Sequence, residues 1–566
     1  MANITVPEPD GTVERAGIEQ SANETRITNT NAPVDTSGLF EEQQRAFEII
    51  NWHIAESLAC RNPPQLLMHV LGAGGVGKSK VIETITDNFE KRGIRNQLVK
   101  AAYTGIAASI IGGSTLHTVA RLPHKGSKQS AESQRKLANF WANICYLIID
   151  EISMVGRDLL AKLSRILATA KAHAGTGATS EPFGGVNVII FGDLHQFPPV
   201  AGRKSAPLFW PINQAKDTED EMTGREIYER FQTVVKLCRQ VRVTDPEWQE
   251  LLQHARMGNC QIKHLKLLHA LTLTNPNCPD VDMSKAPWNE AVLVTPRHAV
   301  RNQWNEVAVL EHCSKTGSQL FISPAEDTIS GRELTLEEKY VVATKRSGRD
   351  GDGHSDKGGL APVLMLAIGM KVMVTSNIET ELDIANGARG KVVDIMLDKR
   401  EPAHSEKDCR VKLQYPPVYV LVKLNRTKAR VLEELEAGVV PIAAMKRTLM
   451  ILDGQTRKTV SRRQIPLTAA YAFTDYRSQG QTLPAVIVDI ATPPTGGLTP
   501  FNAYVQLSRS SGSSTIRILR DFEDKLFTSH PCEFLRKEDE RLEELDAETK
   551  RWWEAHKASI ERNEVN

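Results

Sequence analysis

The sequence predicts an α/β fold in which two cores, each built on a parallel sheet, carry a smaller β-rich insertion. Short apolar runs alternate with helical stretches, and a glycine-rich loop joins one such run to an amphipathic stretch. A segment of alternating apolar and polar residues interrupts the second series of runs. Apolar runs of this length are typical of strands that are buried on both faces of a parallel sheet, so doubly wound cores are expected.

Length and composition fit a multidomain globular protein. The chain has 566 residues, of which 41% are hydrophobic and 25% are charged, so three or four domains are expected. Its net charge of +1 gives no overall preference for polyanions, and a nucleic-acid site would have to depend on local grooves. The eight cysteines form no close pair. This spacing argues against a zinc site and a disulfide framework and favours a reducing compartment.

The apolar runs also argue against a membrane protein, because none reaches the roughly 18 residues that a span requires. Glu8, Asp10 and Glu14 make the N-terminus unlike a signal peptide or a transit peptide. A nuclear location is our expectation, with the cytoplasm and the mitochondrion as open alternatives.

The first core is expected over residues 39–210, after a disordered tail at 1–38 that is rich in Asn, Thr, Glu and Pro. Its strands are expected at 66–71, 98–103, 146–150 and 186–191, and its first clear helix at 78–91. The second core is expected in two pieces, 211–360 and 463–525, with strands at 291–294, 485–490 and 516–519. Between these pieces, residues 361–462 predict an antiparallel β module, preceded by a polar loop at 347–359. Residues 526–566 predict a charged helix exposed to solvent.

The stretch from Gly72 to Ser79 carries the spacing G-x-x-x-x-G-K-[ST] between an expected strand and an expected helix. Such a loop turns its backbone N–H groups toward phosphates, and the helix N-terminus favours the negative charge. The predicted phosphate-binding residues are Gly72, Gly74, Gly75, Gly77, Lys78 and Ser79. Lys78 would contact the β and γ phosphates of ATP, and the Ser79 hydroxyl would bind Mg²⁺.

Two further strand ends carry polar groups suited to the same reaction. Asp150 would bind Mg²⁺ and Glu151 would orient or deprotonate the attacking water, although adjacent acids after a strand also occur as a solvated turn. After the run at 186–191, Gln196 is the candidate for sensing the γ-phosphate, with a packing turn as the alternative.

These motifs together resemble the PIF-one (petite integration frequency) helicases of superfamily 1B. The resemblance rests on the phosphate loop, Asp150-Glu-Ile-Ser-Met154, Pro182-Phe-Gly-Gly185 and the Gly-Asp-x-x-Gln-x-Pro-Pro-Val segment from 192 to 200. It extends from about residue 39 to residue 519. The variants around His195 and Tyr476 look more like helicases of Helitron-type transposons. The resemblance implies tandem RecA-like cores and an SH3-like β insertion.

The same resemblance implies roles for further residues. Gln43 would recognise adenine, Arg239 and Arg509 would supply positive charge to the γ-phosphate from the second core, and Gly480 would lie at the nucleotide. The implied DNA contacts are Tyr103, Thr104, His117, Arg477 and Ser478. One departure concerns the family's usual His-Lys pair, which is Tyr476-Arg477 here. Charge is kept but geometry is not, because Arg and Lys are not interchangeable.

The implied function is an ATP-dependent DNA helicase that moves 5′-to-3′ on single-stranded DNA and unwinds tailed duplexes, in repair, recombination or telomere maintenance. Three alternatives remain: an ATPase that remodels protein–DNA complexes without unwinding, a small-molecule kinase, and a non-catalytic transposon relic. The sequence leaves the physiological DNA structure and the oligomeric state open.

Overall fold

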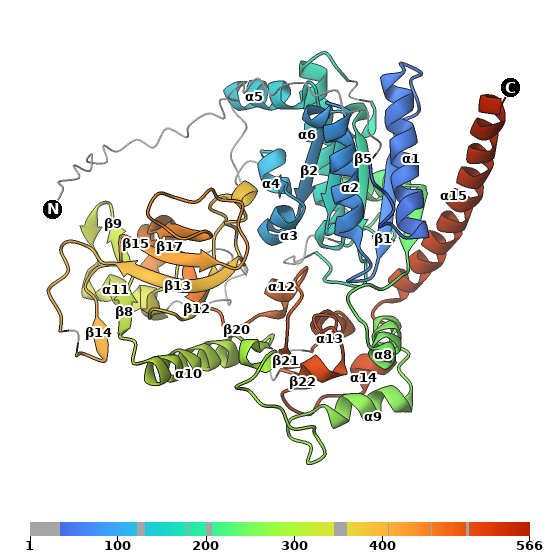
Figure 1. Ribbon diagram of the computed structural model, residues 1–566. Coiled ribbons are helices and arrows are strands. Elements are labelled where there is room, and N and C mark those ends of the chain that lie inside the picture. Colours follow the sequence, from blue (N-terminus) through green and yellow to red (C-terminus); the bar gives the residue numbers. More distant parts are fainter. Residues whose placement is uncertain are drawn as a thin grey trace.

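The computed structural model describes residues 34–121, 131–177, 180–199, 206–344, 359–405, 407–453, 456–493 and 497–565. Figure 1 shows a helix-covered sheet in the first part of the chain, a second and smaller sheet below it, and a β-rich module beside both. The expected disordered tail and polar loop fall almost entirely outside the described residues. Among the described residues, no helix has the length and apolar character that crossing a membrane requires.

The first core contains a six-stranded sheet of order β3-β2-β4-β5-β1-β6, and every pair of neighbouring strands is parallel. Its strands are β1 (Leu67–Gly72), β2 (Leu98–Ala102), β3 (Ser114–Thr115), β4 (Tyr146–Asp150), β5 (Asn187–Gly192) and β6 (Thr233–Leu237). The four strands expected from the apolar runs are therefore confirmed to within one or two residues.

Helices cover both faces of this sheet, because its strands alternate their side chains between two apolar clusters. On β1, Met68 and Val70 pack with α1 (Glu41–Leu58) and α2 (Lys78–Lys91), whereas Leu67 and Leu71 pack toward the opposite helices. Those are α5 (Ala131–Trp141), α6 (Arg157–His173) and α7 (Glu219–Glu229). The short helices α3 (Gly105–Ile110) and α4 (Leu116–Val119) follow β2 and β3. The α/β class and the helix at 78–91 are confirmed.

The first core ends later than residue 210. β6 pairs in parallel with β1, with Val70 opposite Val235, so the chain returns to the first sheet after α7. The boundary predicted at 210 is therefore too early, because the strand that completes the sheet is 23 or more residues further along the sequence.

The second core has a four-stranded parallel sheet of order β20-β7-β21-β22. Its strands are β7 (Val292–Val294), β20 (Ala472–Phe473), β21 (Val486–Val488) and β22 (Ile516–Ile518). Its helices are α8 (Pro246–Met257), α9 (Ile262–Ala270), α10 (His298–Thr316), α12 (Asp475–Ser478), α13 (Pro500–Leu507) and α14 (Lys525–Thr528). The three strands expected here are confirmed, and β20 is an addition.

The β insertion is larger than the segment 361–462. Its antiparallel five-stranded sheet has the order β16-β15-β13-β12-β19, and two smaller sheets have the orders β10-β9-β18-β17 and β11-β8-β14. The elements are β8 (Leu320–Pro324), β9 (Glu326–Ile329), β10 (Arg332–Glu333), α11 (Leu336–Thr344), β11 (Val363–Leu366), β12 (Lys371–Val374), β13 (Arg389–Met396), β14 (Arg410–Lys412), β15 (Tyr419–Leu424), β16 (Val439–Ala443), β17 (Met445–Asp453), β18 (Thr456–Gln464) and β19 (Leu467–Ala469). Because β8 pairs with β11 and β9 pairs with β18, residues from 320 onward belong to this module.

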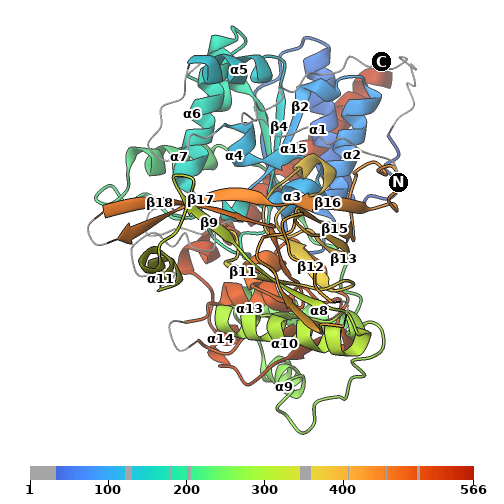
Figure 2. The same ribbon diagram turned by 90° about the vertical axis from the view of Figure 1, so that its left-hand side faces the viewer.

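The insertion lies against α3 of the first core (Figure 2). Arg426, which follows β15, donates from Nη2 to the Ser109 hydroxyl at 3.0 Å. An SH3-like topology for the insertion stays a prediction.

The C-terminal segment forms the single helix α15 (Glu533–Val565), and it is not a solvated surface helix. Leu535, Leu542 and Trp553 are buried against the first core (Figure 1). The Thr549 hydroxyl and the Asp546 carboxylate accept hydrogen bonds from the backbone N–H groups of Val234 and Lys236. These donors lie on β6, the edge strand of the first sheet, so α15 satisfies backbone groups that would otherwise stay unpaired.

Candidate active site

The glycine-rich loop connects β1 to α2 as expected. The backbone of Gly75 and Gly77 lies in the left-handed region, with φ of 92° and 82°, and α2 begins at Lys78. A Cβ atom at Gly75 would collide with the Gln240 side chain, so this position requires glycine on two grounds. The loop therefore presents its backbone at the start of a helix, which is the usual geometry for binding phosphate.

Lys78 lies over this loop. Its Nζ donates hydrogen bonds to the carbonyl oxygens of Gly72 at 2.6 Å and Ala73 at 3.0 Å. Burial lowers the pKa of the ammonium group, and the carboxylates of Asp193, Glu151 and Asp150 act in the opposite direction. The lysine thus lies among acids at the carboxyl edge of the sheet, where open α/β sheets bind ligands.

The predicted acid pair lies at the end of β4. Burial, followed by the negative charge of Glu151, raises the pKa of Asp150 to about 7, and the Asp150 Oδ1 accepts a hydrogen bond from the Glu151 N–H at 2.9 Å. Glu151 has φ 54° and ψ 48°, a conformation that is uncommon outside glycine. Its Oε2 accepts a hydrogen bond from Gln479 Nε2 at 3.0 Å, so the second core contacts the candidate base directly.

Three side-chain nitrogens converge beside Gly74 in the phosphate loop. Measured to the point that a Gly74 Cβ would occupy, Arg242 Nη1 and Arg509 Nη2 lie at 3.5 Å and Gln196 Nε2 at 3.6 Å. The predicted Gln196 and Arg509 are therefore brought to the loop, together with an arginine that was not predicted. All three are hydrogen-bond donors, as an anion-binding site requires.

Arg509 is held in place by the second core. Its Nε donates to the Val505 carbonyl at 2.8 Å, and its Nη1 donates to the carbonyls of Ser478 and Gln481. Burial, followed by the positive charge of Arg242, lowers the pKa of Arg509 to about 10. Two guanidinium groups that repel each other beside a phosphate loop would be stabilised by a bound polyphosphate.

The structure places Arg239 elsewhere. Its guanidinium lies over the Phe40 ring, 4.0 Å from the ring centroid. The reason is local, because Gln240 Nε2 donates to the Gly74 carbonyl and the Val241 N–H donates to the Gly75 carbonyl. These two hydrogen bonds hold the segment alongside the phosphate loop and place Arg242 beside Gly74. Arg242 lies in the connection between β6 of the first core and α8 of the second, and its Nη1 donates to the Ser508 carbonyl at 3.2 Å.

Gln43 and Gly480 lie beside parts of the same site. Gln43 is buried, its Nε2 donates to the Val76 carbonyl at 2.9 Å, and its Oε1 accepts from the Phe40 N–H at 3.0 Å. Gly480 lies next to Glu151 rather than beside the phosphate loop. The adenine role of Gln43 stays a prediction.

The predicted DNA contacts fall on both cores. Tyr103 and His117 lie edge to face with ring centroids 6.1 Å apart, and the Thr104 hydroxyl caps α3 by accepting from the Ala107 N–H. Arg477 is partly exposed on α12. Ser478 is fully buried and its hydroxyl donates to the Asp475 carbonyl at 2.6 Å, so its side chain does not reach the surface. The prediction of a DNA contact through the Ser478 side chain is not supported by this placement.

Asp193 is a central residue of the site that sequence reasoning did not single out. Burial alone would raise the pKa of its carboxyl group, but Arg256, His195 and Lys78 hold it at about 2. Its oxygens accept hydrogen bonds from Arg256 Nη2 at 2.9 Å and from the Tyr504 hydroxyl at 3.0 Å. These partners lie on α8 and α13, so Asp193 links the loop after β5 to the second core. Its place in the Gly-Asp-x-x-Gln segment was the available signal.

The unusual Tyr476 makes a second link between the cores. Its ring stacks on Phe197, with centroids 4.1 Å apart and an angle of 22° between the planes. Phe197 directly follows Gln196 and is buried. The residue that departs from the family pattern therefore packs on the loop that carries the candidate phosphate sensor.

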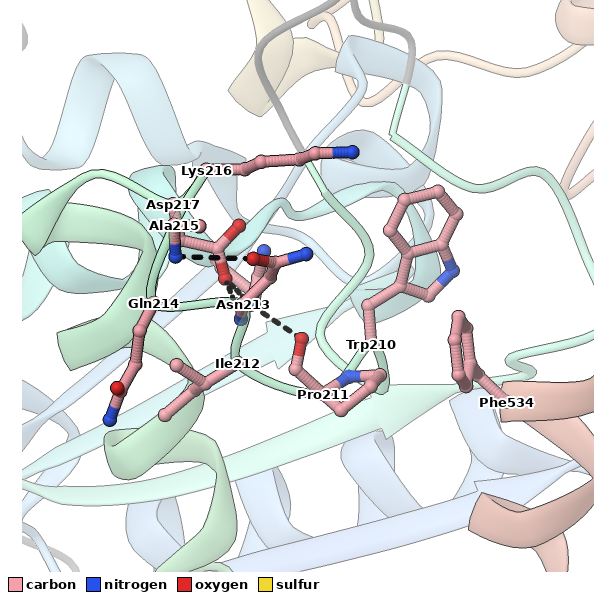
Figure 3. A pocket seen from close by; sticks show the side chains of 10 residues that line it. Trp210, Pro211, Ile212, Asn213, Gln214, Ala215, Lys216, Asp217 and Phe534 are labelled. Carbon is pink, nitrogen blue, oxygen red and sulfur yellow. Dashed lines mark hydrogen bonds and ion pairs between the residues drawn. The ribbon is translucent and has the colours of Figure 1, made fainter.

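A separate pocket lies between the segment 210–217 and the start of α15 (Figure 3). Arg157 lines it and pairs with Asp217 at 2.9 Å, while Trp210 and Phe534 lie with ring centroids 6.0 Å apart. No residue of the phosphate loop lines this pocket, so it is distinct from the nucleotide site.

Known proteins with similar sequences are helicases. Residues 38–262 match the family model described as PIF1-like helicase. The human ATP-dependent DNA helicase PIF1 is 27% identical over 80% of this chain and 58% of its own length. The yeast (Saccharomyces cerevisiae) ATP-dependent DNA helicase RRM3 is 24% identical over 81% of this chain and 63% of its own length. The chain thus spans about three fifths of the length of these relatives.

Solved structures show the same fold. The Pif1 helicase of Candida albicans superposes with a TM-score of 0.60 at 23% identity, covering 89% of this chain and 99% of that one. Bacteroides Pif1 bound to single-stranded DNA superposes with a TM-score of 0.56 at 23% identity, covering 89% and 96%. The expected fold of tandem RecA-like cores is therefore confirmed, and residues 38–262 in particular make the chain similar to PIF1-like helicases.

Proposed function

We propose that this protein is an ATP-dependent DNA helicase, which hydrolyses ATP and uses the energy to move on single-stranded DNA and separate duplex strands. The observation that carries the proposal is the convergence of both cores on one phosphate loop. Lys78, Glu151 and Gln196 come from the first core, whereas Arg509 and Gln479 come from the second. A site shared in this way changes its contacts when the γ-phosphate leaves, which couples hydrolysis to relative movement of the cores.

The chemistry assigned to the chain's own residues follows from their positions. Glu151 would orient the attacking water and accept its proton, and the guanidinium groups of Arg242 and Arg509 would stabilise the negative charge of the transferring phosphoryl group. Gln196 lies between Gly74 and the Phe197–Tyr476 stack, so it is placed to report the state of the phosphate to the second core.

The residues fit a bound Mg²⁺ ion. Asp150 is buried beside Glu151, and this pairing of two acids is relieved by a divalent cation. The Ser79 hydroxyl at the start of α2 would supply the second protein ligand. The ion would neutralise charge on the β and γ phosphates.

Direction of travel and cellular role are parts of the same proposal. The family resemblance supports 5′-to-3′ movement on single-stranded DNA and action on tailed duplexes in repair, recombination or telomere maintenance. A nuclear location is consistent with cysteines that form no close pairs.

The proposal is tested by ATP turnover with and without single-stranded DNA, together with strand separation of 5′-tailed and 3′-tailed duplexes. DNA should stimulate turnover, and only the 5′-tailed duplex should be unwound. Lys78→Ala should abolish hydrolysis. Glu151→Gln should keep ATP binding while hydrolysis falls by roughly 10²–10⁴.

Each alternative outcome would support a different function for this protein. ATP turnover that DNA does not stimulate would support a small-molecule kinase. DNA-stimulated turnover without strand separation would support a remodelling ATPase. Wild-type turnover in Lys78→Ala would remove the phosphate-loop assignment itself.

A further inference from the structure

His195 has two hydrogen-bonding neighbours that fix its tautomer. It lies in the loop after β5 and is 1% exposed; its Nδ1 lies 2.9 Å from the Arg256 carbonyl oxygen on α8. Its Nε2 lies 2.7 Å from Asp539 Oδ2 on α15. A carbonyl oxygen only accepts, so Nδ1 carries the hydrogen. In the neutral ring the lone pair of Nε2 then faces the lone pairs of a carboxylate, and such a pair requires a cation between them.

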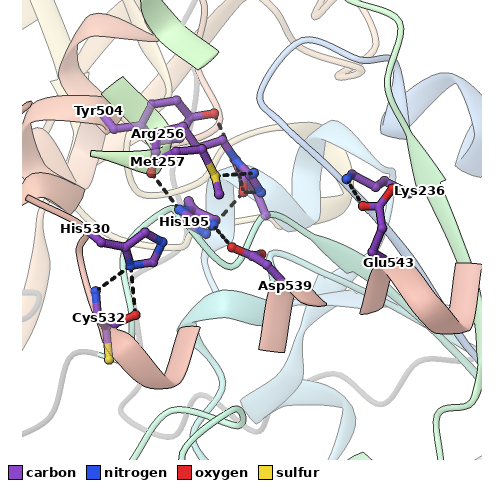
Figure 4. A network of polar contacts seen from close by, with 10 residues as sticks. His195, Lys236, Arg256, Met257, Tyr504, His530, Cys532, Asp539 and Glu543 are labelled. Atoms are coloured by element: carbon purple, nitrogen blue, oxygen red, sulfur yellow. Dashed lines mark hydrogen bonds and ion pairs between the residues drawn. The ribbon is translucent and has the colours of Figure 1, made fainter. Parts of the chain in front are cut away.

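A second imidazole lies next to this pair. The rings of His195 and His530 are 5.9 Å apart at an angle of 80° (Figure 4). His530 Nδ1 lies 2.9 Å from the Cys532 carbonyl oxygen and also lies 3.3 Å from the Cys532 N–H, so it donates to the first in one tautomer and accepts from the second in the other. In the tautomer with the hydrogen on Nδ1, Nε2 is a lone-pair atom. That atom is buried and has no hydrogen-bond partner among the described residues, which is costly unless something binds it.

We propose that His195, His530 and Asp539 bind a Zn²⁺ ion. One ligand atom from each residue lies within 4.8 Å of the other two. In a tetrahedral zinc site neighbouring ligand atoms lie roughly 3.3 Å apart, so small side-chain adjustments complete the geometry. Two imidazoles and one carboxylate are ligands suited to zinc, and water would occupy the fourth position. The Arg256 carbonyl on His195 Nδ1 is the outer-shell partner that orients zinc-bound histidines.

A shared proton is the simplest competing explanation, and it accounts for less. A proton between His195 Nε2 and Asp539 Oδ2 would satisfy those two atoms. It would leave His530 Nε2 buried without a partner. A metal ion accounts for all three atoms at once.

A second cluster of similar composition serves as an internal comparison. Glu250, His254 and His264 also lie within ligand range of one another. There, His264 Nδ1 accepts a hydrogen bond from the Gln261 N–H at 3.1 Å, so Nε2 carries the hydrogen in the neutral ring. Lys263 already pairs with the Glu250 carboxylate at 2.6 Å. The Glu250 carboxylate therefore already has a cationic partner in this cluster.

The site would join three parts of the chain that are far apart in sequence. His195 lies between Asp193 and Gln196 of the active-site loop, its outer partner is on α8 of the second core, and Asp539 is on α15. A metal here would hold the sensor loop against the C-terminal helix. The cysteine spacing gave no sign of it, because its ligands are two histidines and an aspartate, and His195 is more than 300 residues from the other two.

The test is metal content and affinity of the purified full-length chain without nucleotide. After incubation with Zn²⁺ and gel filtration, elemental analysis should find one zinc per chain. Replacement by Co²⁺ should give the visible bands of a tetrahedral site without the intense sulfur-to-cobalt band that a cysteine ligand produces. His530→Gln and Asp539→Asn should each weaken zinc binding by at least tenfold, and His254→Gln should leave it unchanged.

Folding is checked independently of metal. A zinc-selective chelator should lower the melting temperature of the wild-type protein and leave that of His530→Gln unaltered. A zinc content below a tenth of an equivalent in the wild type would overturn the proposal. The shared proton between His195 and Asp539 would then be the remaining explanation. Equal zinc in wild type and His530→Gln would also overturn the proposal. None of these measurements depends on ATP turnover, so the helicase proposal stands or fails separately.

Discussion

Two arginines three residues apart have different surroundings in this structure. Arg239 lies over Phe40, and Arg242 lies beside Gly74 at the phosphate loop. The sequence Arg-Gln-Val-Arg gives no means of choosing between them, because either guanidinium could face a phosphate. The choice is made by the Gln240 and Val241 hydrogen bonds to the loop, which depend on the pairing of β6 with β1.

Replacing each arginine by alanine should therefore have unequal effects. A guanidinium that stabilises the transferring phosphoryl group contributes roughly 10³–10⁵ in rate. We expect Arg242→Ala to lower the kcat for ATP hydrolysis by at least 10³ and Arg239→Ala to lower it less than tenfold. Steady-state turnover with saturating single-stranded DNA measures both. A larger loss of kcat in Arg239→Ala than in Arg242→Ala would indicate that Arg239, not Arg242, contacts the phosphate.

Lys100 is a lysine in an unfavourable position. Burial, followed by the positive charges of Arg95 and Lys428, lowers its pKa to about 8, and its Nζ donates only a 3.2 Å hydrogen bond to the Thr86 hydroxyl. Between pH 8 and the unfolded value of 10.5, the unfolded chain holds more protons than the folded one. The free energy of unfolding therefore rises with pH across that window. At pH 7 the charged Lys100 lowers that free energy by its full amount.

Lys100→Met should for this reason stabilise the protein at pH 7. The expected gain in the free energy of unfolding is about 1 kcal/mol after allowance for partial solvent exposure, and it should vanish near pH 10. Urea denaturation at both pH values measures it, with the exposed Lys266→Met as the charge-matched control. A gain that is equal at both pH values would mean that apolar packing, not charge, is responsible.

At the scale of secondary structure, elements with a local signal were predictable and those defined by distant partners were not. The runs that became β1, β2, β4 and β5 are mostly apolar, so local composition was enough. β6 is a five-residue strand whose place is set by β1, more than 150 residues earlier. The site follows the same rule, since Lys78, Glu151 and Gln196 lie in recognisable motifs while the position of Arg242 depends on tertiary packing.

The helix α15 shows how charge can conceal a buried face. Its mean composition is strongly polar, yet Glu538 accepts a hydrogen bond from the buried Tyr228 hydroxyl at 2.9 Å and Asp546 pairs with Arg45. These two acids thus contact the first core, although most acids of the helix are exposed. Leu535 and Leu542 are spaced seven residues apart, which puts them on one face of the helix.

Leu542→Ala should accordingly destabilise the first core. Truncating a buried leucine typically costs about 2–5 kcal/mol, because contacts are lost and a cavity remains. Phe534→Ala, at a side chain that is 41% exposed on the same helix, should cost less than about 1 kcal/mol. Urea denaturation followed by circular dichroism compares them. If both variants unfold at the same urea concentration as the wild type, α15 does not contribute to the stability of the core.

Across the whole molecule, the contacts between parts gather at the nucleotide site and at the insertion. The second core reaches the first through Gln479 on Glu151, Tyr504 on Asp193 and Tyr476 on Phe197. The insertion reaches it through Arg426 on Ser109. The first three contacts involve residues beside the phosphate loop. A structural change at this loop would therefore alter contacts with the second core directly, without involving the insertion.

Charge is unevenly spread despite the overall value of +1. The acid-rich α15 lies along β6, the edge strand of the first sheet, whereas the ammonium groups of Lys100 and Lys428 both lie near Gly112, where the first core meets the insertion. Two lysines held together at such a junction are stabilised by an anion between them. Under the proposed function, the backbone of a single DNA strand would supply one.

DNA binding should therefore depend on salt although the protein is nearly neutral. Each phosphate neutralised on a single strand contributes about −0.7 to the slope of log affinity against log salt concentration, so about four contacts give a slope of roughly −3. We expect Lys428→Gln to make that slope shallower by about 0.7, because one such contact is lost. Lys550→Gln removes the same charge from α15, where Lys550 lies near Glu41 and Glu554, and it should leave the slope unchanged. Fluorescence anisotropy of a labelled single strand over a series of NaCl concentrations measures all three proteins. Equal slopes in the two variants would show that the junction of the first core and the insertion does not contact the DNA backbone, and a slope near zero in the wild type would show that base stacking dominates binding.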